Sequence, residues 1–129
     1  MKEKSNFDSS APAPERLIGW LVSYGLDEMG LSYEIRAGRS FVASDGTCPE
    51  RSLLIDDDTI SSPHLAVRAT AKHKVMVQDI FSDFGSYIMR GNADKEQPIT
   101  GPTEVRHGDW IRIGKNVRFQ VCLIDGQTR

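Results

Sequence analysis

Apolar and polar residues alternate along several short segments of this chain. The clearest case is residues 116–124, where every second residue from Val117 to Leu123 is apolar. A period of two is typical of a β-strand with one buried face. No window shows a sustained period of 3.6 residues with helix caps. We therefore expect strands at residues 18–24, 31–35, 40–44, 51–56, 64–70, 74–80, 86–90, 109–114 and 116–124.

Short strands separated by turn residues predict an all-β fold, a sandwich of two sheets that are mostly antiparallel. We expect one domain over residues 16–125, because a chain of 129 residues leaves little room for two. Residues 1–15 are polar and bury too little apolar surface to offset ordering, so a flexible tail is expected there. A long polar loop is expected at residues 91–102, and a short frayed end at residues 126–129.

Composition narrows the kinds of partner that we expect. The formal net charge of −2 lacks the basic excess of nucleic-acid-binding domains, so we expect no nucleic-acid partner. An apolar run at residues 17–22 is far shorter than the roughly 20 residues of a membrane-spanning helix, so we expect no membrane insertion and a cytoplasmic location. Cys48 and Cys122 are far apart in the sequence and are expected to be free thiols.

The loops at one end of a β-sandwich commonly carry its function. One candidate loop contains Ser61, Ser62 and His64 after an acidic run. A serine hydrolase is disfavoured, because Pro63 separates Ser62 from His64 and no Gly-rich turn surrounds either serine. The histidines and cysteines lack the paired spacing of metal ligands, so we expect no metal and no cofactor. We expect His64 to brace the turn by donating to a backbone carbonyl.

Three motifs, in their order and spacing, resemble the forkhead-associated (FHA) domain, a phosphothreonine-binding β-sandwich. Each motif is weak alone, but the three occur in the right order on predicted strand–loop boundaries, and the resemblance covers essentially the whole folded region. They are Ser61-x-x-His64, the run from Asp79 through Ser82 to Gly85-Ser86, and His107-Gly108-Asp109 followed by Ile111, Ile113 and Gly114.

The resemblance implies that Ser61 and Ser62 contact a phosphate, with help from Ser82 and from an Arg in a Gly-Arg at the end of the third strand. For Ser61, a hydroxyl that only stabilises the local turn is the alternative. Gly85 is expected to supply a positive φ. Residues 108–109, Gly108 and Asp109, are expected to form the hairpin turn before the next strand.

The chain departs from the FHA pattern where phosphate would bind. Counting strands places the family's Gly-Arg at Ala43-Ser44, so Ser44 replaces the phosphate-binding Arg. Gly38-Arg39 then belongs to the turn before the third strand. Losing that Arg removes charge-assisted hydrogen bonds worth about 1.5–3 kcal/mol each. Arg39 or Arg51 could serve as the substitute.

The loop within residues 79–87 departs from the FHA pattern as well. Asp83 stands where the family usually has a small hydroxyl residue or Lys, and Phe84 stands where it usually has Asn. A carboxylate repels a phosphate of charge near −2. Phe84 has two interpretations, a cap on the end of the sandwich or an exposed apolar anchor for a partner.

The sequence therefore predicts a non-catalytic protein–protein interaction module whose partner is another protein or a phosphopeptide. Its degenerate pocket favours phospho-independent or weak phosphothreonine binding. One alternative is a working phosphothreonine reader that uses Ser61, Ser62 and a recruited Arg39 or Arg51. More remote alternatives are a structural subunit of a larger assembly and a small Ser/His hydrolase.

Overall fold

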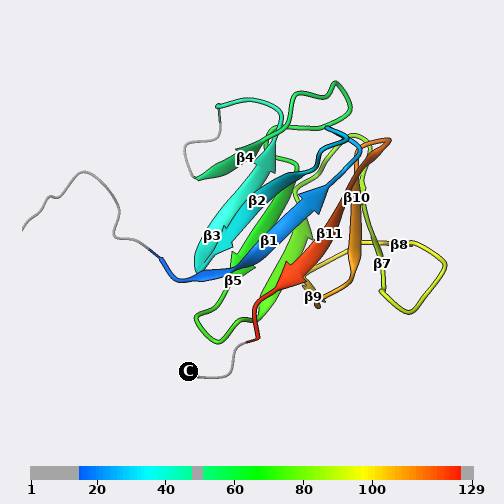
Figure 1. The fold of residues 1–129 in the computed structure, drawn as a ribbon. Helices are drawn as coiled ribbons and strands as arrows, with labels where there is room; N and C mark the ends of the chain where they lie inside the picture. Colours follow the sequence, from blue (N-terminus) through cyan, green and yellow to red (C-terminus); the bar gives the residue numbers. More distant parts are fainter. Residues whose placement is uncertain (1–14, 48–50, 126–129) are drawn as a thin grey trace, which may run out of the picture.

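The computed structural model describes residues 15–47 and 51–125, and these residues form eleven strands (Figure 1). The predicted tail, except for Glu15, and the predicted end at 126–129 lie outside the described residues, as does Cys48. The strands are β1 (Leu17–Ser23), β2 (Leu31–Arg36), β3 (Gly38–Ala43), β4 (Ser52–Leu54), β5 (Leu65–Ala69), β6 (Val75–Asp79), β7 (Ser86–Met89), β8 (Gln97–Pro98), β9 (Thr103–Val105), β10 (Trp110–Ile113) and β11 (Val117–Leu123).

The strands form two sheets that pack face to face. One sheet has the order β2-β1-β11-β10-β7-β8, and the other has the order β4-β3-β5-β6-β9. The β3–β4 pair is parallel, and the other strand pairs are antiparallel. The predicted all-β sandwich is confirmed. The described residues contain no helix that could cross a membrane.

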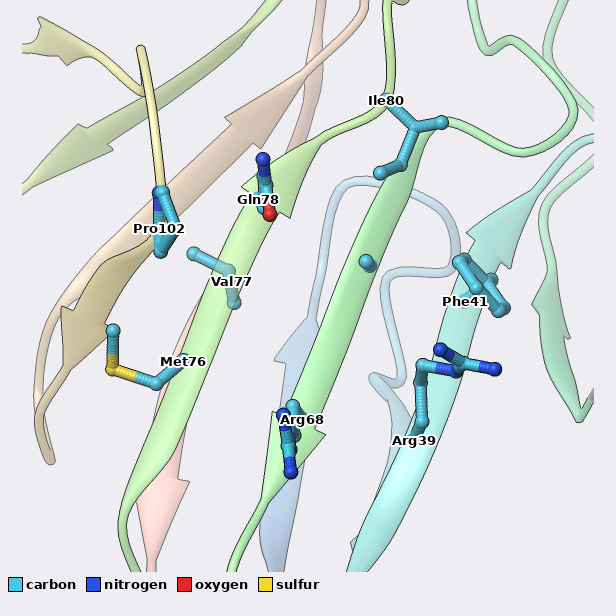
Figure 2. A pocket seen from close by; sticks show the side chains of 9 residues that line it. Arg39, Phe41, Arg68, Met76, Val77, Gln78, Ile80 and Pro102 are labelled. Atoms are coloured by element: carbon cyan, nitrogen blue, oxygen red, sulfur yellow. The ribbon is translucent and has the colours of Figure 1, made fainter.

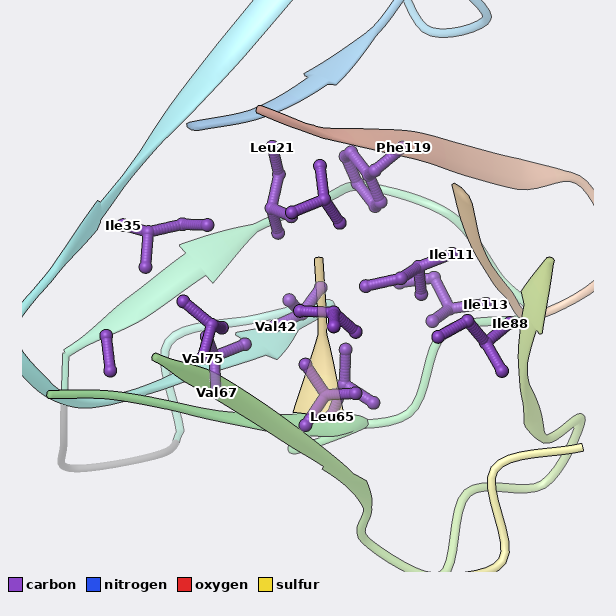
Figure 3. Close-up of a cluster of buried hydrophobic side chains, with 14 of the residues drawn as sticks. Leu21, Ile35, Val42, Leu65, Val67, Val75, Ile88, Ile111, Ile113 and Phe119 are labelled. Atoms are coloured by element: carbon purple, nitrogen blue, oxygen red, sulfur yellow. The ribbon is translucent and has the colours of Figure 1, made fainter. Parts of the chain in front are cut away.

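Alternation in the strands builds the core between the two sheets (Figure 3). In β11 Val117, Phe119 and Val121 are buried while the residues between them are at least partly exposed, as the period of two predicts. The core is almost entirely aliphatic, and the Tyr33 ring meets the Phe119 ring edge-on at 5.9 Å. Other buried members include Ile18, Leu21, Ile35, Val42, Leu65, Val67, Val75, Val77, Ile88, Ile111 and Ile113.

Two short strands were not expected from the sequence. β8 lies inside the predicted polar loop at 91–102, and β9 follows that loop directly. Both are edge strands, β8 beside β7 and β9 beside β6. Each is too short to show a period of two, and β8 contains Pro98, which only an edge strand tolerates well. The prediction of a loop was therefore wrong at β8.

The start of β3 also differs from the prediction. Gly38 and Arg39 are the first two residues of β3, so they do not belong to a turn before it. Ala37 alone separates β2 from β3, and the φ of Gly38 is +107°. A side chain rarely adopts that φ, so Gly38 relieves the tight bend as expected.

Strand directions bring five connections to one end of the sandwich. These connections are residues 24–30, 44–47, 55–64, 80–85 and 114–116, and we call them the loop end. Backbone hydrogen bonds join them to each other and to the strand ends, such as His64 N–H to Val42 O at 2.8 Å and Gly114 N–H to Gly85 O at 3.2 Å. Most of the predicted site residues lie here.

Candidate functional site

His64 is the buried centre of the loop end, with no exposed surface. Its Nδ1 accepts the Ser61 backbone N–H at 2.9 Å, and its Nε2 lies 2.9 Å from the Gly85 carbonyl oxygen. Because a backbone N–H can only donate, Nδ1 must be the acceptor and Nε2 must carry the proton that Gly85 accepts. His64 therefore joins the β4–β5 loop to the β6–β7 loop. This geometry matches the bracing role that the sequence predicts, and it leaves His64 no free nitrogen for proton transfer to Ser61 or Ser62.

Ser61 links the same two loops from the outside. Its Oγ accepts the backbone N–H of Asp83 at 3.1 Å. A hydroxyl that accepts a bond still has its own proton to donate. Ser61 is half-buried, so this proton can reach a ligand at the surface.

The Ser62 hydroxyl is hydrogen-bonded to Asp45, shortly after the end of β3. Its Oγ donates toward the Asp45 carboxylate at 2.8 Å and also lies 3.1 Å from the Asp45 carbonyl oxygen. Ser44, half-buried, follows the last residue of β3 and precedes Asp45. Hydrogen bonds from the Thr47 hydroxyl, the Thr47 N–H and the Ser62 hydroxyl lower the pKa of Asp45 from its ordinary 3.8. Asp45 is therefore ionised at neutral pH, and a negative charge stands next to Ser44.

Asp79 and Ser82 shape the β6–β7 loop. The Asp79 carboxylate accepts the hydroxyls of Ser82 and Ser86, each at 2.5 Å, and the Ser82 N–H at 3.0 Å. Ser82 Oγ accepts the N–H of Gly85, whose φ is +84° as predicted. Burial by itself raises the pKa of Asp79, but these hydrogen bonds and nearby His64 lower it overall. The one proton of the Ser82 hydroxyl is directed into the loop, so Ser82 acts on its shape.

The tip of the β6–β7 loop exposes two aromatic rings. Phe81 is 99% exposed and has a φ of +48°, which is strained for a bulky side chain. Phe84 is 42% exposed, and the Lys115 ammonium lies 5.3 Å from its ring centroid. Asp83, also exposed, lies between them. The Phe84 side chain is thus exposed at the tip of this loop.

The two candidate arginines lie away from these loops. Arg51 Nη2 is 3.5 Å from the carbonyl oxygens of Arg36 and Ala37, at the turn that precedes β3. Arg39 is the second residue of β3, whereas Ser44 follows the end of that strand. Five residues of extended chain span about 16 Å. The structure therefore brings together Ser44, Ser61, Ser62, Ser82, Asp83 and Phe84, and leaves out Arg39 and Arg51.

Gly108 and Asp109 form a turn at the end of the sandwich opposite the loop end. Gly108 has a φ of +92°, and Trp110 begins the next strand. The buried Asp109 carboxylate accepts Arg90 Nη1 at 2.8 Å and the N–H groups of Gly91 and Arg106. The two residues do precede the next strand, but the prediction of a hairpin turn was wrong, because the turn joins β9 and β10, which belong to different sheets. The turn lies too far from the loop end to join the candidate site.

The motifs, the two sheets and the loop geometry agree with a comparison against protein families. A model described as FHA domain matches residues 35–114, more than half of the chain. The chain belongs to the FHA domain family. FHA domains are known as phosphopeptide-binding protein-interaction modules and are generally non-catalytic. No curated protein sequence matches the chain.

Solved FHA structures have the same fold. The FHA domain of an Arabidopsis thaliana hypothetical protein gives a TM-score of 0.63 at 20% identity, covering 95% of this chain and 99% of that chain. An FHA domain from Chlamydia trachomatis gives 0.64 at 17% identity, covering 82% and 96%. A structure from a study of phosphothreonine-dependent FHA domain interactions gives 0.61 at 21% identity, covering 82% and 95%. At these identities the likeness concerns the fold.

Sequence reasoning missed three residues of this FHA domain's loop end. Asp45 follows Ser44 directly, and its Asp-Gly turn could have suggested a carboxylate near the end of β3. Phe81 is an aromatic residue in a polar loop, which is a signal for an exposed anchor. Lys115 is the one Lys or Arg among the described residues of the loop end, and only the fold places it beside Phe84. Among residues 15–47 and 51–125, no cluster of His, Cys, Asp or Glu could hold a metal ion.

Proposed function

We propose that this FHA domain docks a partner protein through its loop end, without depending on phosphothreonine. The observation that carries the proposal is the hydrogen bond from Ser62 Oγ to the Asp45 carboxylate beside the end of β3. Because a hydroxyl has one proton, Ser62 cannot donate to a phosphate while it donates to Asp45. The charge next to Ser44 is negative, whereas a phosphate pocket needs positive charge there.

The loop end as a whole carries negative charge. Its described residues include seven carboxylates against the single ammonium of Lys115. The Thr59 hydroxyl and N–H lower the pKa of Asp57, so that carboxylate is ionised, as is Asp45. A phosphate of charge near −2 is repelled by such groups. The seven are Asp27, Glu28, Asp45, Asp56, Asp57, Asp58 and Asp83.

Apolar exposure is concentrated at the same end. All large hydrophobic side chains that are clearly exposed in the described residues lie within the loop end or, for Leu54, directly before one of its loops. Exposed aromatic residues are common hot spots of protein interfaces. Apolar anchors among carboxylates suit a partner surface that offers apolar pockets and basic groups. The exposed side chains are Tyr24, Met29, Leu54, Phe81 and Phe84.

A backbone-amide NMR titration tests the need for phosphate. Pools of phosphothreonine peptides, and then the matching unphosphorylated pools, are added to the domain. We expect neither pool to shift the amides of Ser61 and Ser62 up to millimolar peptide. Ser44→Arg serves as the positive control, since it returns a guanidinium to the end of β3. Shifts caused only by the phosphorylated pools on the unchanged domain would overturn the proposal.

Affinity capture from cells that make the protein tests docking by the aromatic anchors. We expect the captured partner to survive phosphatase treatment and to be lost with Phe81→Ser together with Phe84→Ser. The outer face of the other sheet provides a control, Arg118→Gln on β11, which should capture normally. A partner that is lost on phosphatase treatment and retained by the double variant would contradict the proposal.

A working phosphothreonine reader is the second candidate. It is supported by the proton that Ser61 keeps available and by the ammonium of Lys115 beside Phe84. In that case Ser61→Ala and Lys115→Gln would each weaken the binding of phosphothreonine peptides. In the first candidate neither change alters the binding of any phosphopeptide.

A further inference from the structure

Four cationic side chains lie close together at the end of the sandwich opposite the loop end. Two come from the β5–β6 turn, one comes from β5, and one follows the last residue of β9. Val75 and Val105 are cross-strand partners, so Lys74 and Arg106, the residues just beyond them, are neighbours as well. All four side chains are exposed, and we call them the basic corner. They are Arg68, Lys72, Lys74 and Arg106.

The basic corner keeps its positive charge. No hydrogen bond or ion pair reaches its four cationic groups from any residue that the structure describes. Arg68 is the cross-strand partner of Met76 and thus the diagonal neighbour of Lys74. Glu104, beside Met76, is the one carboxylate that the described strands place on this face of the sheet. The corner therefore carries a net positive charge that a partner can neutralise.

A hollow of about 460 Å³ lies beside the basic corner, on the outer face of the same sheet (Figure 2). Ala66 on β5 has Phe41 of β3 on one side and Gln78 of β6 on the other. Because the Ala66 side chain is a single methyl group, the surface is recessed between these larger neighbours. Ligand pockets measure roughly 300–1,000 Å³, so an aromatic ring fits this hollow. Arg68 also lines the hollow, so the recess adjoins a cation of the corner.

The loop end has the complementary features. Its seven carboxylates outnumber its single ammonium, and the Phe81 ring is 99% exposed. An exposed aromatic anchor binds best in a recess, and carboxylates bind surfaces of positive charge. The hollow and the basic corner offer a recess and cations together, and they belong to the same chain. Charge complementarity therefore selects a second copy of the chain as the occupant.

We propose that the loop end of one copy docks on the hollow and the basic corner of a second copy. This pairing rests on the proposed function, since it gives the loop end its partner. Phe81 enters the hollow over Ala66, and the carboxylates around Phe81 contact the cations of the corner. Because the two surfaces differ, each contact leaves a loop end free on one copy and a corner free on the other. Such heterologous contacts repeat into rings or filaments.

Sedimentation velocity of the full chain tests self-association. We expect the mean sedimentation coefficient to rise between micromolar and millimolar protein, and to fall again in about 1 M salt, because salt screens exposed charges. We expect Arg68→Gln to weaken self-association about threefold, since it removes one cation beside the hollow. Arg118→Gln is the matched control, because it removes one exposed arginine from the other sheet and should leave self-association unchanged. A sedimentation coefficient that stays constant up to millimolar protein, or an equal loss with Arg118→Gln, would overturn the proposal.

Two differently blocked variants test whether the contact joins two different surfaces. Phe81→Ser together with Phe84→Ser removes the anchors, and Ala66→Glu fills the hollow and adds a carboxylate to it. We expect each variant to be monomeric alone. We expect an equimolar mixture to form a heterodimer and nothing larger, because each variant keeps one intact surface. A mixture that stays monomeric would overturn the proposal.

The double phenylalanine variant also distinguishes a failure of this proposal from a failure of loop-end docking. Suppose that the unchanged chain does not self-associate, while the partner captured from cells is still lost with the double variant. The second copy is then excluded, and docking by the loop end stands. Normal capture and normal self-association by the double variant would overturn both.

Discussion

At the scale of single residues, the His64 imidazole connects backbone groups of two different loops. We expect His64→Ala to lower the free energy of unfolding by about 2–4 kcal/mol, because it leaves a cavity, removes the acceptor of the Ser61 N–H and leaves the Gly85 carbonyl with only the Gly114 N–H. His107 is the matched control, since it is exposed and accepts one backbone N–H, that of Leu123. We expect His107→Ala to lower the free energy by about 1 kcal/mol or less. Equal losses in urea denaturation would contradict the bracing role of His64.

The Asp79 carboxylate makes the stability of the domain depend on pH. Its pKa is lowered in the folded state, so its contribution is complete above the unfolded pKa of about 3.9 and is lost as pH falls through the folded value. We expect Asp79→Asn to be less stable at neutral pH. The difference from the unchanged protein should narrow below about pH 4. Denaturation at several pH values checks this, and a constant difference would contradict it.

Phe81 combines full exposure with a strained backbone. Asn tolerates a positive φ better than an aromatic residue does. We therefore expect Phe81→Asn to raise the free energy of unfolding by about 0.5–1 kcal/mol while it weakens docking at the loop end. Thermal denaturation and partner capture measure the two effects. A variant that loses stability would show that the Phe81 ring supports the fold.

At the scale of elements, the β10–β11 turn packs directly against the β4–β5 loop. Gly114 has a φ of +61°, and a Cβ there would overlap the Thr59 hydroxyl oxygen. That oxygen accepts the Lys115 N–H at 3.0 Å. We expect Gly114→Ala to lower the free energy of unfolding by about 1–3 kcal/mol.

Gly46 offers the matched control for Gly114. No atom lies within 4 Å of the position that its Cβ would take. We expect Gly46→Ala to change stability by less than about 0.5 kcal/mol. If the two glycine variants were equally stable, the loop end would not depend on the contact between Thr59 and Gly114.

Elements with strong alternation were predictable, and those without it were not. The segment 116–124 contains β11 because half of its side chains are apolar and regularly spaced. β8 and β9 were not predicted, because strands of two or three residues are too short to show a period of two. At the site, the position of Ser61 and His64 followed from a local motif. The hydrogen bond from the Asp83 N–H to Ser61 spans 22 residues and the bond from the Ser62 hydroxyl to Asp45 spans 17, so only the packed fold reveals them.

At the scale of the whole molecule, charge is divided between two regions. Among the described residues, more than half of the exposed carboxylates lie at the loop end near its aromatic anchors, whereas Arg39 and Arg68 lie on the outer face of one sheet. A partner of the loop end is therefore expected to present basic groups to it.

The domain boundaries are a further proposal at this scale. His73 Nε2 accepts Arg16 Nε at 2.8 Å, and its Nδ1 lies 2.9 Å from the Ile124 carbonyl oxygen. Since Arg can only donate, the His73 proton is on Nδ1 and Ile124 accepts it. We expect a fragment of residues 16–125 to unfold cooperatively, with the stability of the whole chain. Urea denaturation of both checks this, and a clearly less stable fragment would show that the flanking segments belong to the domain.

The contacts of His73 also determine how the two ends of the domain are arranged. Ile124 N–H donates to Ile18 O at 2.9 Å, so the first strand begins beside the point where the last strand ends, at the end opposite the loops. The polypeptide therefore enters and leaves at nearly one point. Such a module can be inserted into a surface loop of a host protein, or circularly permuted through a short peptide linker, with its loops left facing solvent. It can also be tethered to a sensor surface by either terminus with its interaction loops pointing away from the support.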